Sequence, residues 1–381
     1  MSFPTVALKN VCEFLDHLRK PVTESDRKPG PFPYYGANGR QDWVDSYIFD
    51  EPLILLAEDG GHFGSQDRPI AYKVTGKCWV NNHAHVLRPK PNCNVDYLHR
   101  VLSFYDVTKF ISGTTRPKLT KGKAQEIAIP LPPLAEQQRI ADILSRADRL
   151  RRLRRFALEM SAGYLQAVFL EMFGESFQKR HGVVLFPKVV WFQEGPGVRK
   201  WQFKSEGIKL LNVGNIVNGQ LDLSNTSRFL AEDEAFGKYA HFLCEPDDIV
   251  MASSGVTWGK TAIVYPEHLP LCMNTSTIRM RPKGDNTLLR QYLRGFIESP
   301  FFVRQIEVLI TGSAQPNFGP LHLKQVEIVV PEIGKQQAYS EIADRWNHLR
   351  AQQREALRQA EQLFQGLLQA AFRGELTPPQ A

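Results

Sequence analysis

The chain has 381 residues, of which 43% are hydrophobic, and carries a formal net charge of +7. This length predicts about two to three domains with sizeable cores, and the basic balance suits a polyanionic partner such as nucleic acid. The five cysteines are scattered and never spaced CxxC, which argues against a disulfide framework or a zinc knuckle. Residues 1–30 hold no apolar run typical of a signal peptide, and no segment approaches a membrane span. We therefore expect a soluble, cytoplasmic protein.

Residues 1–130 consist of short β-prone runs separated by turns. Strands are expected at residues 47–49, 53–57, 78–80 and 84–87, where glycine, asparagine and proline mark the ends of the runs. Residues 95–110 carry apolar side chains at helical spacing, and a basic loop follows at residues 113–121. This pattern predicts an α+β domain dominated by strands.

A proline-led segment, Pro130-Leu131-Pro132-Pro133-Leu134-Ala135-Glu136-Gln137-Gln138, opens the next part of the chain. Prolines are favoured just before and at the first turn of a helix. From there to about Phe173 there is no proline, and Gly163 is the one interior glycine. Apolar or small residues recur at steps of three, four and seven, which predicts a long helix that buries one stripe; the stripe includes Ile143 and Leu150.

The same segment occurs twice. Sliding the sequence against itself by about half its length aligns Gly113 with Gly312, Pro132 with Pro331 and Phe173 with Phe372. A repeat of this length indicates a duplicated domain plus helix and not a solenoid. The second helix carries its own stripe, which includes Ile342 and Leu349. Because neither helix can bury its stripe alone, we expect the two, each about 50 Å long, to pack against each other.

Residues 177–330 follow the plan of the first domain with a divergent sequence. Strands are expected at residues 209–216, 248–252 and 262–265, and a helix at residues 288–310. The fold class is therefore α+β, with two strand-rich α/β domains separated by two long helices. The predicted boundaries are a first domain at 1–130, a central helix at 131–176, a second domain at 177–330, a distal helix at 331–376 and a tail at 377–381.

No catalytic constellation is present. Gly255–Thr261 resembles a phosphate loop, but only three residues separate its glycines and a strand pattern follows, so ATP binding is disfavoured. Gln315–Phe318 has the wrong order for an amino-methyltransferase tetrad. His83, His85 and Cys93 lack a second ligand cluster, so structural roles are favoured over a metal site. We expect no catalytic residues and no metal.

Basic and amide side chains in the loops are the candidate DNA contacts. Arginine, asparagine and glutamine can read base edges, whereas lysine mainly contacts phosphates. For each residue taken singly, a solvated surface role remains the alternative, as it does for the arginine-rich stretch 139–155. The DNA-binding candidates are Tyr34, Tyr35, Asn38, Arg40, Arg116, Lys118, Lys121, Arg199, Lys200, Thr257, Trp258, Lys260, Gln315 and Asn317. Candidates for helix packing or subunit docking are Gln137, Gln138, Ile143, Leu150, Gln336, Gln337, Ile342 and Leu349.

The duplicated proline-led motif resembles one family, the specificity (S) subunits (HsdS) of type I restriction-modification systems. Further matching stretches are 34–39, 79–86, 274–277 and 372–376. The second copy departs from the pattern, because Pro331-Glu332 replaces the double proline, although the pair Gln336-Gln337 persists.

The resemblance implies a non-catalytic, sequence-specific DNA-binding subunit. Each globular domain would be a target recognition domain that reads one half of a bipartite, asymmetric site in double-stranded DNA. The helices would form an antiparallel coiled coil that sets the spacer and docks the modification (M) subunits.

The family also implies partners: two M subunits that use S-adenosylmethionine, and two restriction (R) subunits that use ATP and Mg, with no cofactor on this chain. A stand-alone DNA-binding adaptor without a methyltransferase partner, and an enzyme with an unrecognised site, remain the alternatives.

Overall fold

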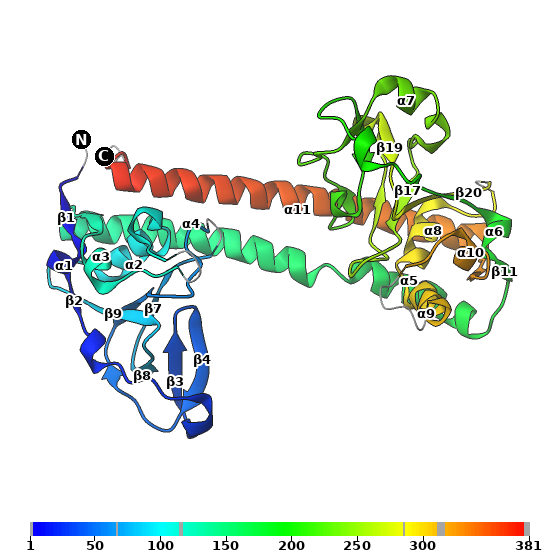
Figure 1. Cartoon of the computed structure of the whole chain (residues 1–381). Helices are drawn as coiled ribbons and strands as arrows, with labels where there is room; N and C mark the ends of the chain where they lie inside the picture. The colour runs from blue at the N-terminus through cyan, green and yellow to red at the C-terminus, as the bar shows by residue number, and fades with distance from the viewer. Residues whose placement is uncertain (1–2, 66–67, 114–116, 285, 311–316, 377–381) are drawn as a thin grey trace, which may run out of the picture. The chain divides into compact units, whose positions relative to one another are not determined.

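The computed structural model describes residues 3–65, 68–113, 117–284, 286–310 and 317–376. The chain forms two compact units (Figure 1). Unit 1 comprises Met1–Phe156 and Arg354–Ala381, and unit 2 comprises Ala157–Gln353. Each unit contains a globular lobe and parts of the long helices. We call the globular parts lobe 1 (residues 3–133) and lobe 2 (residues 179–332).

Lobe 1 contains two four-stranded sheets, with strand orders β2-β9-β6-β7 and β4-β3-β8-β5. A separate pair, β1 with β10, joins the start of the lobe to its end. The predicted strands at 53–57, 78–80 and 84–87 are confirmed, whereas the expected helix at 95–110 ends at Ser103. The elements are β1 Thr5–Ala7, α1 Leu8–Val11, β2 Cys12–Phe14, β3 Phe32–Gly36, β4 Gly39–Val44, β5 Phe49–Asp50, β6 Leu53–Ala57, β7 Ala71–Val74, β8 Lys77–Val80, β9 Ala84–Pro89, α2 Val95–Ser103, α3 Lys121–Gln125 and β10 Ala128–Pro130.

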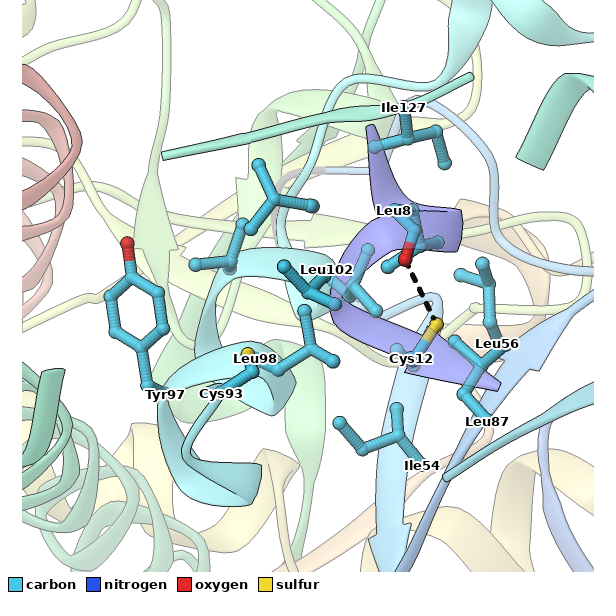
Figure 2. Close-up of a cluster of buried hydrophobic side chains, with 14 of the residues drawn as sticks. Leu8, Cys12, Ile54, Leu56, Leu87, Cys93, Tyr97, Leu98, Leu102 and Ile127 are labelled. Atoms are coloured by element: carbon cyan, nitrogen blue, oxygen red, sulfur yellow. Dashed lines mark hydrogen bonds between the residues drawn. The ribbon is translucent and has the colours of Figure 1, made fainter. Parts of the chain in front are cut away.

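The main core of lobe 1 lies between the first sheet and helices α1 and α2 (Figure 2). Every residue of β6 is buried, as expected for a central strand whose sequence is continuously apolar. Asn94 caps the N-terminus of helix α2, because its side-chain oxygen accepts from the amides of Asp96 and Tyr97 and so satisfies two otherwise unpaired donors. Leu98 and Leu102 of α2 are completely buried in this core.

Lobe 2 repeats this plan. Its sheet β12-β20-β17-β18 has the same order and antiparallel pairing as β2-β9-β6-β7, and β11 pairs with β21 as β1 pairs with β10. Three further strands form the sheet β16-β13-β19. The elements are β11 Val183–Leu185, α6 Phe186–Val189, β12 Val190–Glu194, β13 Ile208–Leu211, β14 Ile216–Val217, β15 Gln220–Leu221, β16 Phe229–Leu230, α7 Glu232–Phe236, β17 Ile249–Ala252, β18 Thr261–Ile263, β19 Leu271–Met273, β20 Thr277–Pro282, α8 Arg290–Ile297, α9 Pro300–Leu309, α10 Pro320–Leu323 and β21 Glu327–Val329.

Two expected continuous helices are interrupted. The helix predicted at 288–310 is two helices, α8 and α9, because Pro300 begins the second one and cannot continue a helix interior. The helix predicted at 131–176 is also two, α4 (Leu134–Met160) and α5 (Tyr164–Gln178). The break contains Gly163, whose backbone freedom makes it a weak point in a helix. The distal helix α11 runs from Ile333 to Arg373 without a break.

The predicted apolar stripe is wrong for part of each helix. Leu150 is 40% exposed and Leu349 50% exposed, while Ile143 and Ile342 are half-buried. The buried positions of α4 lie on another face: Gln137, Ile140, Ala141, Leu144, Ala147, Asp148 and Arg151. The stripe failed because an ion pair, Arg151 with Asp148, occupies part of the buried face in place of apolar side chains.

Within unit 1, α4 and α11 run in opposite directions. Arg139 donates to the carbonyl oxygen of Leu376 at 2.6 Å, and Arg155 pairs with Glu361 at 2.6 Å. Phe364 of α11 is completely buried, and its ring contacts Phe104 at a centroid distance of 5.3 Å. The end of α11 therefore belongs to the core of unit 1.

All five cysteines are free and buried. Burial raises the pKa of each thiol, to about 11 for Cys78 and to about 12 for Cys93 and Cys272. Among the described residues, no helix has the length and apolar character needed to cross a membrane.

Candidate nucleic-acid interface

Three segments of lobe 1 that are distant in sequence meet at one surface. The Asn38 side chain, in the β3–β4 turn, donates to the carbonyl oxygen of Gly60 at 2.9 Å. The neighbouring residue Asp59 forms an isolated β-bridge with Lys118, in the predicted basic loop. The structure thereby brings together parts of two candidate DNA-binding segments, residues 34–40 and 117–121.

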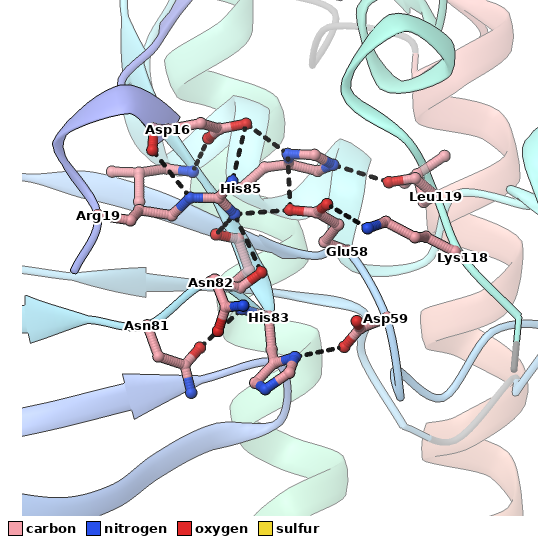
Figure 3. Close-up of polar contacts among 12 residues, drawn as sticks. Asp16, Arg19, Glu58, Asp59, Asn81, Asn82, His83, His85, Lys118 and Leu119 are labelled. Atoms are coloured by element: carbon pink, nitrogen blue, oxygen red, sulfur yellow. Dashed lines mark hydrogen bonds and ion pairs between the residues drawn. The ribbon is translucent and has the colours of Figure 1, made fainter. Parts of the chain in front are cut away.

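A buried ion-pair network lies beneath Lys118 (Figure 3). The Lys118 ammonium contacts Glu58 Oε1 at 3.0 Å, and Arg19 contacts Glu58 Oε2 at 2.6 Å. His85, which is completely buried, places Nδ1 2.7 Å from Asp16 Oδ2 and Nε2 2.8 Å from the carbonyl oxygen of Leu119. The loop that carries Lys118 is therefore held at both its side chain and its main chain.

Neighbouring cations and hydrogen bonds set the charge of the two carboxyl groups in this network. Burial alone would raise the pKa of Asp16, but the hydrogen bond and charge of His85, the Val86 amide and Arg19 hold it below 3.8. Burial likewise opposes ionisation of Glu58, yet Arg19, Lys118 and His85 hold its pKa below 4.5. Both carboxylates are thus anions whose charge is balanced by neighbouring cations and hydrogen-bond donors.

Asp16, Glu58 and His85 also form a group whose ligand atoms lie within 4.8 Å of one another. Their donor and acceptor atoms already contact Arg19, Lys118 and the Leu119 carbonyl. A divalent cation would have to displace two resident cations, so these residues fit an ion-pair network and not a metal site.

Exposed aromatic and cationic side chains continue the surface of lobe 1. Arg40 is exposed and stacks on Trp43 with its guanidinium 4.6 Å from the ring centre, and Trp43 is itself 45% exposed. Tyr35 is half-buried, and Lys121 is exposed at the start of α3. Tyr34 is corrected: its side chain is 1% exposed and its hydroxyl contacts the main chain of Val22, so it cannot contact DNA through its ring. Arg116 lies outside the described residues.

Lobe 2 has an equivalent surface. Ser254 and Asn317 form an isolated β-bridge at the position of the Asp59–Lys118 bridge. Trp258, in the β17–β18 turn, packs edge-on against Phe318 at a centroid distance of 5.7 Å. Thr257 and Lys260 in the same turn are exposed, so these candidates lie together beside Asn317. Gln315 lies outside the described residues.

Two other candidates of lobe 2, Arg199 and Lys200, form a separate group. They are exposed beside Trp201, whose side chain is 76% exposed. These residues flank Val198, which packs in a core with β13 and Tyr239.

Of the two alternatives given for Gln137 and Gln336, helix packing or subunit docking, burial is compatible with packing alone. Both side chains are 0% exposed and hydrogen-bonded inside their own units, so neither amide is available to a partner subunit. Gln138 and Gln337 are exposed.

The sequence and the fold of this chain are similar to those of known proteins. Residues 2–158 match the family model of the type I restriction modification DNA specificity domain. A putative type I restriction enzyme specificity subunit of Haemophilus influenzae is 41% identical over 137 residues, which span 36% of this chain and 35% of that protein. The MjaVIII specificity subunit of Methanocaldococcus jannaschii is 25% identical over 392 residues, which span 93% of this chain and 90% of that protein.

A solved structure also shares the fold. The type I restriction-modification S subunit from M. genitalium superposes with a TM-score of 0.63 at 14% identity, and the match covers 100% of this chain and 97% of that one. The matched domain, the full-length relative and the shared fold agree with one another: residues 2–158 match a type I restriction modification DNA specificity domain, and the whole chain is similar to type I restriction-modification specificity (S) subunits.

Proposed function

We propose that this chain is the DNA-recognition subunit of a type I restriction-modification complex, in which lobe 1 reads one half of a bipartite, asymmetric site and lobe 2 reads the other. The supporting observation is the pair of equivalent bridges, Asp59–Lys118 and Ser254–Asn317. They occupy the same place in two lobes of the same sheet order but present different side chains. Two similar readers with different contact groups would recognise two different half-sites.

The long helices have two roles in this proposal. They form an antiparallel coiled coil that fixes the spacer between the half-sites, and they dock the modification subunits. Leu150, Leu153 and Phe156 of α4 support docking, because they are 40%, 54% and 59% exposed and exposed apolar side chains in a row favour a protein partner. Leu349 of α11, which is 50% exposed, is a further candidate.

In this proposal, the catalytic steps would be carried out by the partner subunits. Two modification subunits would bind S-adenosylmethionine and methylate the DNA, and two restriction subunits would use ATP and Mg. The contribution of this chain would be recognition of double-stranded DNA through the exposed loops of its two lobes. The domain boundaries we propose are recognition domains at 1–130 and 177–330, with helical segments at 131–176 and 331–376.

The test is methylome sequencing of a host that expresses the chain with its modification subunit, compared with the same host without it. A new bipartite motif with a fixed spacer is expected. The Lys118→Ala variant should then weaken or alter one half of that motif, and Asn317→Ala the other, with Lys123→Ala as a control because Lys123 is exposed and pairs with Glu126. The proposal fails if either variant changes both halves equally, or if a folded, methylation-competent complex writes no bipartite motif.

A further inference from the structure

One glutamine side chain makes the same three hydrogen bonds in both units. In unit 1, Gln137 Oε1 accepts from the amide of Asn94 at 2.7 Å. Its Nε2 donates to the carbonyl oxygens of Asn92 at 3.1 Å and Pro132 at 2.8 Å. The side chain therefore uses its acceptor and both donors on main-chain groups.

Unit 2 repeats the arrangement with different neighbours. Gln336 Oε1 accepts from the amide of Leu289 at 2.9 Å, and its Nε2 donates to the carbonyl oxygens of Thr287 at 3.0 Å and Pro331 at 2.8 Å. Thr287 takes the place of Asn92, and Leu289 takes the place of Asn94. The contacts survive these changes because all of them are made to the main chain.

The bonded segments are those that set how a lobe meets its long helix. Residues 92–94 and 287–289 lie immediately before α2 and α8, and the prolines lie in the turns that lead into α4 and α11. A second bond spans the same junction in each unit: the hydroxyl of Tyr97 donates to Pro130 and that of Tyr292 donates to Val329, each at 2.7 Å. Rotation of a lobe about its proline turn would break these bonds and leave buried main-chain groups unpaired.

We propose that Gln137 and Gln336 are positioning residues that hold each recognition lobe at a fixed angle to its long helix, and that this angle determines the spacing at which the two half-sites are read. The inference rests on the proposed function. Neither glutamine touches DNA in this scheme, since both are completely buried. They act through the direction in which the recognition loops face.

The first test measures the angle directly and does not depend on DNA. Two spin labels are placed on cysteines introduced at Glu267 in lobe 2 and Arg345 in α11, both of which are exposed. Their distance distribution is compared in the full chain, the Gln336→Glu variant and the Gln337→Glu control. Gln336→Glu replaces both N–H donors with an acceptor that faces two carbonyl oxygens, so the distribution should broaden or shift. Gln337→Glu changes an exposed side chain and should leave it as it is in the wild type.

If the Gln336→Glu variant does not fold, Gln336→Met replaces it, since methionine removes all three hydrogen bonds without adding charge. Thermal melting followed by circular dichroism shows whether each variant is folded. The inference is overturned if the folded Gln336 variants give the wild-type distribution, or if the control broadens as much as they do.

The second test reads the spacer from the methylome of the complex with the modification subunit. Gln137 and Gln336 variants should keep the bases of both half-sites while methylation spreads over more than one spacer length or falls at least tenfold at the wild-type spacing. Altered bases at an unchanged spacer would contradict a positioning role. If the wild-type complex writes no bipartite motif, the proposed function fails, whereas the label distances still decide whether Gln336 holds the junction of lobe 2 with α11.

Discussion

Neutralising Glu58 should destabilise lobe 1 specifically. In the Glu58→Gln variant, Arg19 loses a carboxylate 2.6 Å away in a pair whose side chains are only 14% and 12% exposed. Removing one partner of a buried ion pair costs about 3–5 kcal/mol, and the glutamine still offers an oxygen to Arg19, so we expect a loss of about 2–3 kcal/mol. Lys118 adds little to this figure, because its side chain is 46% exposed and such pairs contribute about 0–1 kcal/mol.

Hydrogen exchange during chemical denaturation measures this loss one lobe at a time. Amides of β6 and β9 report on lobe 1, and those of β17 and β20 provide an internal reference in lobe 2. The matched control is Glu126→Gln, since Glu126 pairs with Lys123 in the same lobe but both side chains are more than half exposed. Equal losses in the two variants, or an equal loss in both lobes, would refute the assignment of the Glu58 network as a local anchor.

The remaining predictions are three pairs of measurements. Phe364→Ala should cost unit 1 about 3–5 kcal/mol, because Phe364 is completely buried, whereas Leu363→Ala, at a position 51% exposed, should cost less than about 1 kcal/mol in the same denaturation assay. Gly295→Ala should destabilise unit 2 by about 1–3 kcal/mol, because the new Cβ would lie 2.6 Å from Phe169 and Tyr339; Gly366→Ala, with nothing within 4 Å, should stabilise α11 by up to about 1 kcal/mol. Lowering the pH should weaken lobe 1, because the folded state depresses the pKa values of Asp16 and Glu58. The stability that these shifts contribute is complete above the unfolded pKa values near 3.8 and 4.5 and is lost as the pH falls through the lower folded values. Hydrogen exchange of β6 amides, measured over an acid titration, should therefore show a loss of protection that is smaller in the Glu58→Gln variant.

The sequence was a good guide where local pattern and the internal repeat carry the information. The apolar run at 53–57 is the completely buried strand β6. The shift that aligns Gly113 with Gly312 also aligns Lys118 with Asn317, and the structure has these two residues in equivalent bridges. Both results follow from patterns that survive without knowledge of distant contacts.

The sequence was a poor guide where burial depends on tertiary partners. Arg151 is buried against Asp148, with its guanidinium 4.1 Å from the ring centre of Phe364, so a charged residue occupies a core position that a hydrophobic pattern assigns to its neighbour Leu150. Tyr34 failed for the opposite reason, since a turn-rich stretch with two tyrosines gives no indication of which ring faces inward.

The surface that joins Asn38, Gly60 and Lys118 illustrates a further limit. Its contacts run between segments more than twenty residues apart, and neither composition nor periodicity encodes such a meeting. The hydrogen bonds of Gln137 and Gln336 were likewise hidden, because their partners are main-chain groups that leave no signature in the sequence.

The buried thiols have a practical consequence for spectroscopy of this protein. Thiol-directed probes react with the thiolate, and burial raises the pKa of every cysteine in the chain far above neutral pH. The five natural cysteines of the folded protein should therefore react little with maleimide or thiol-directed nitroxide reagents. A single cysteine placed on either lobe would be labelled selectively, without first removing the natural five and disturbing the cores in which they pack.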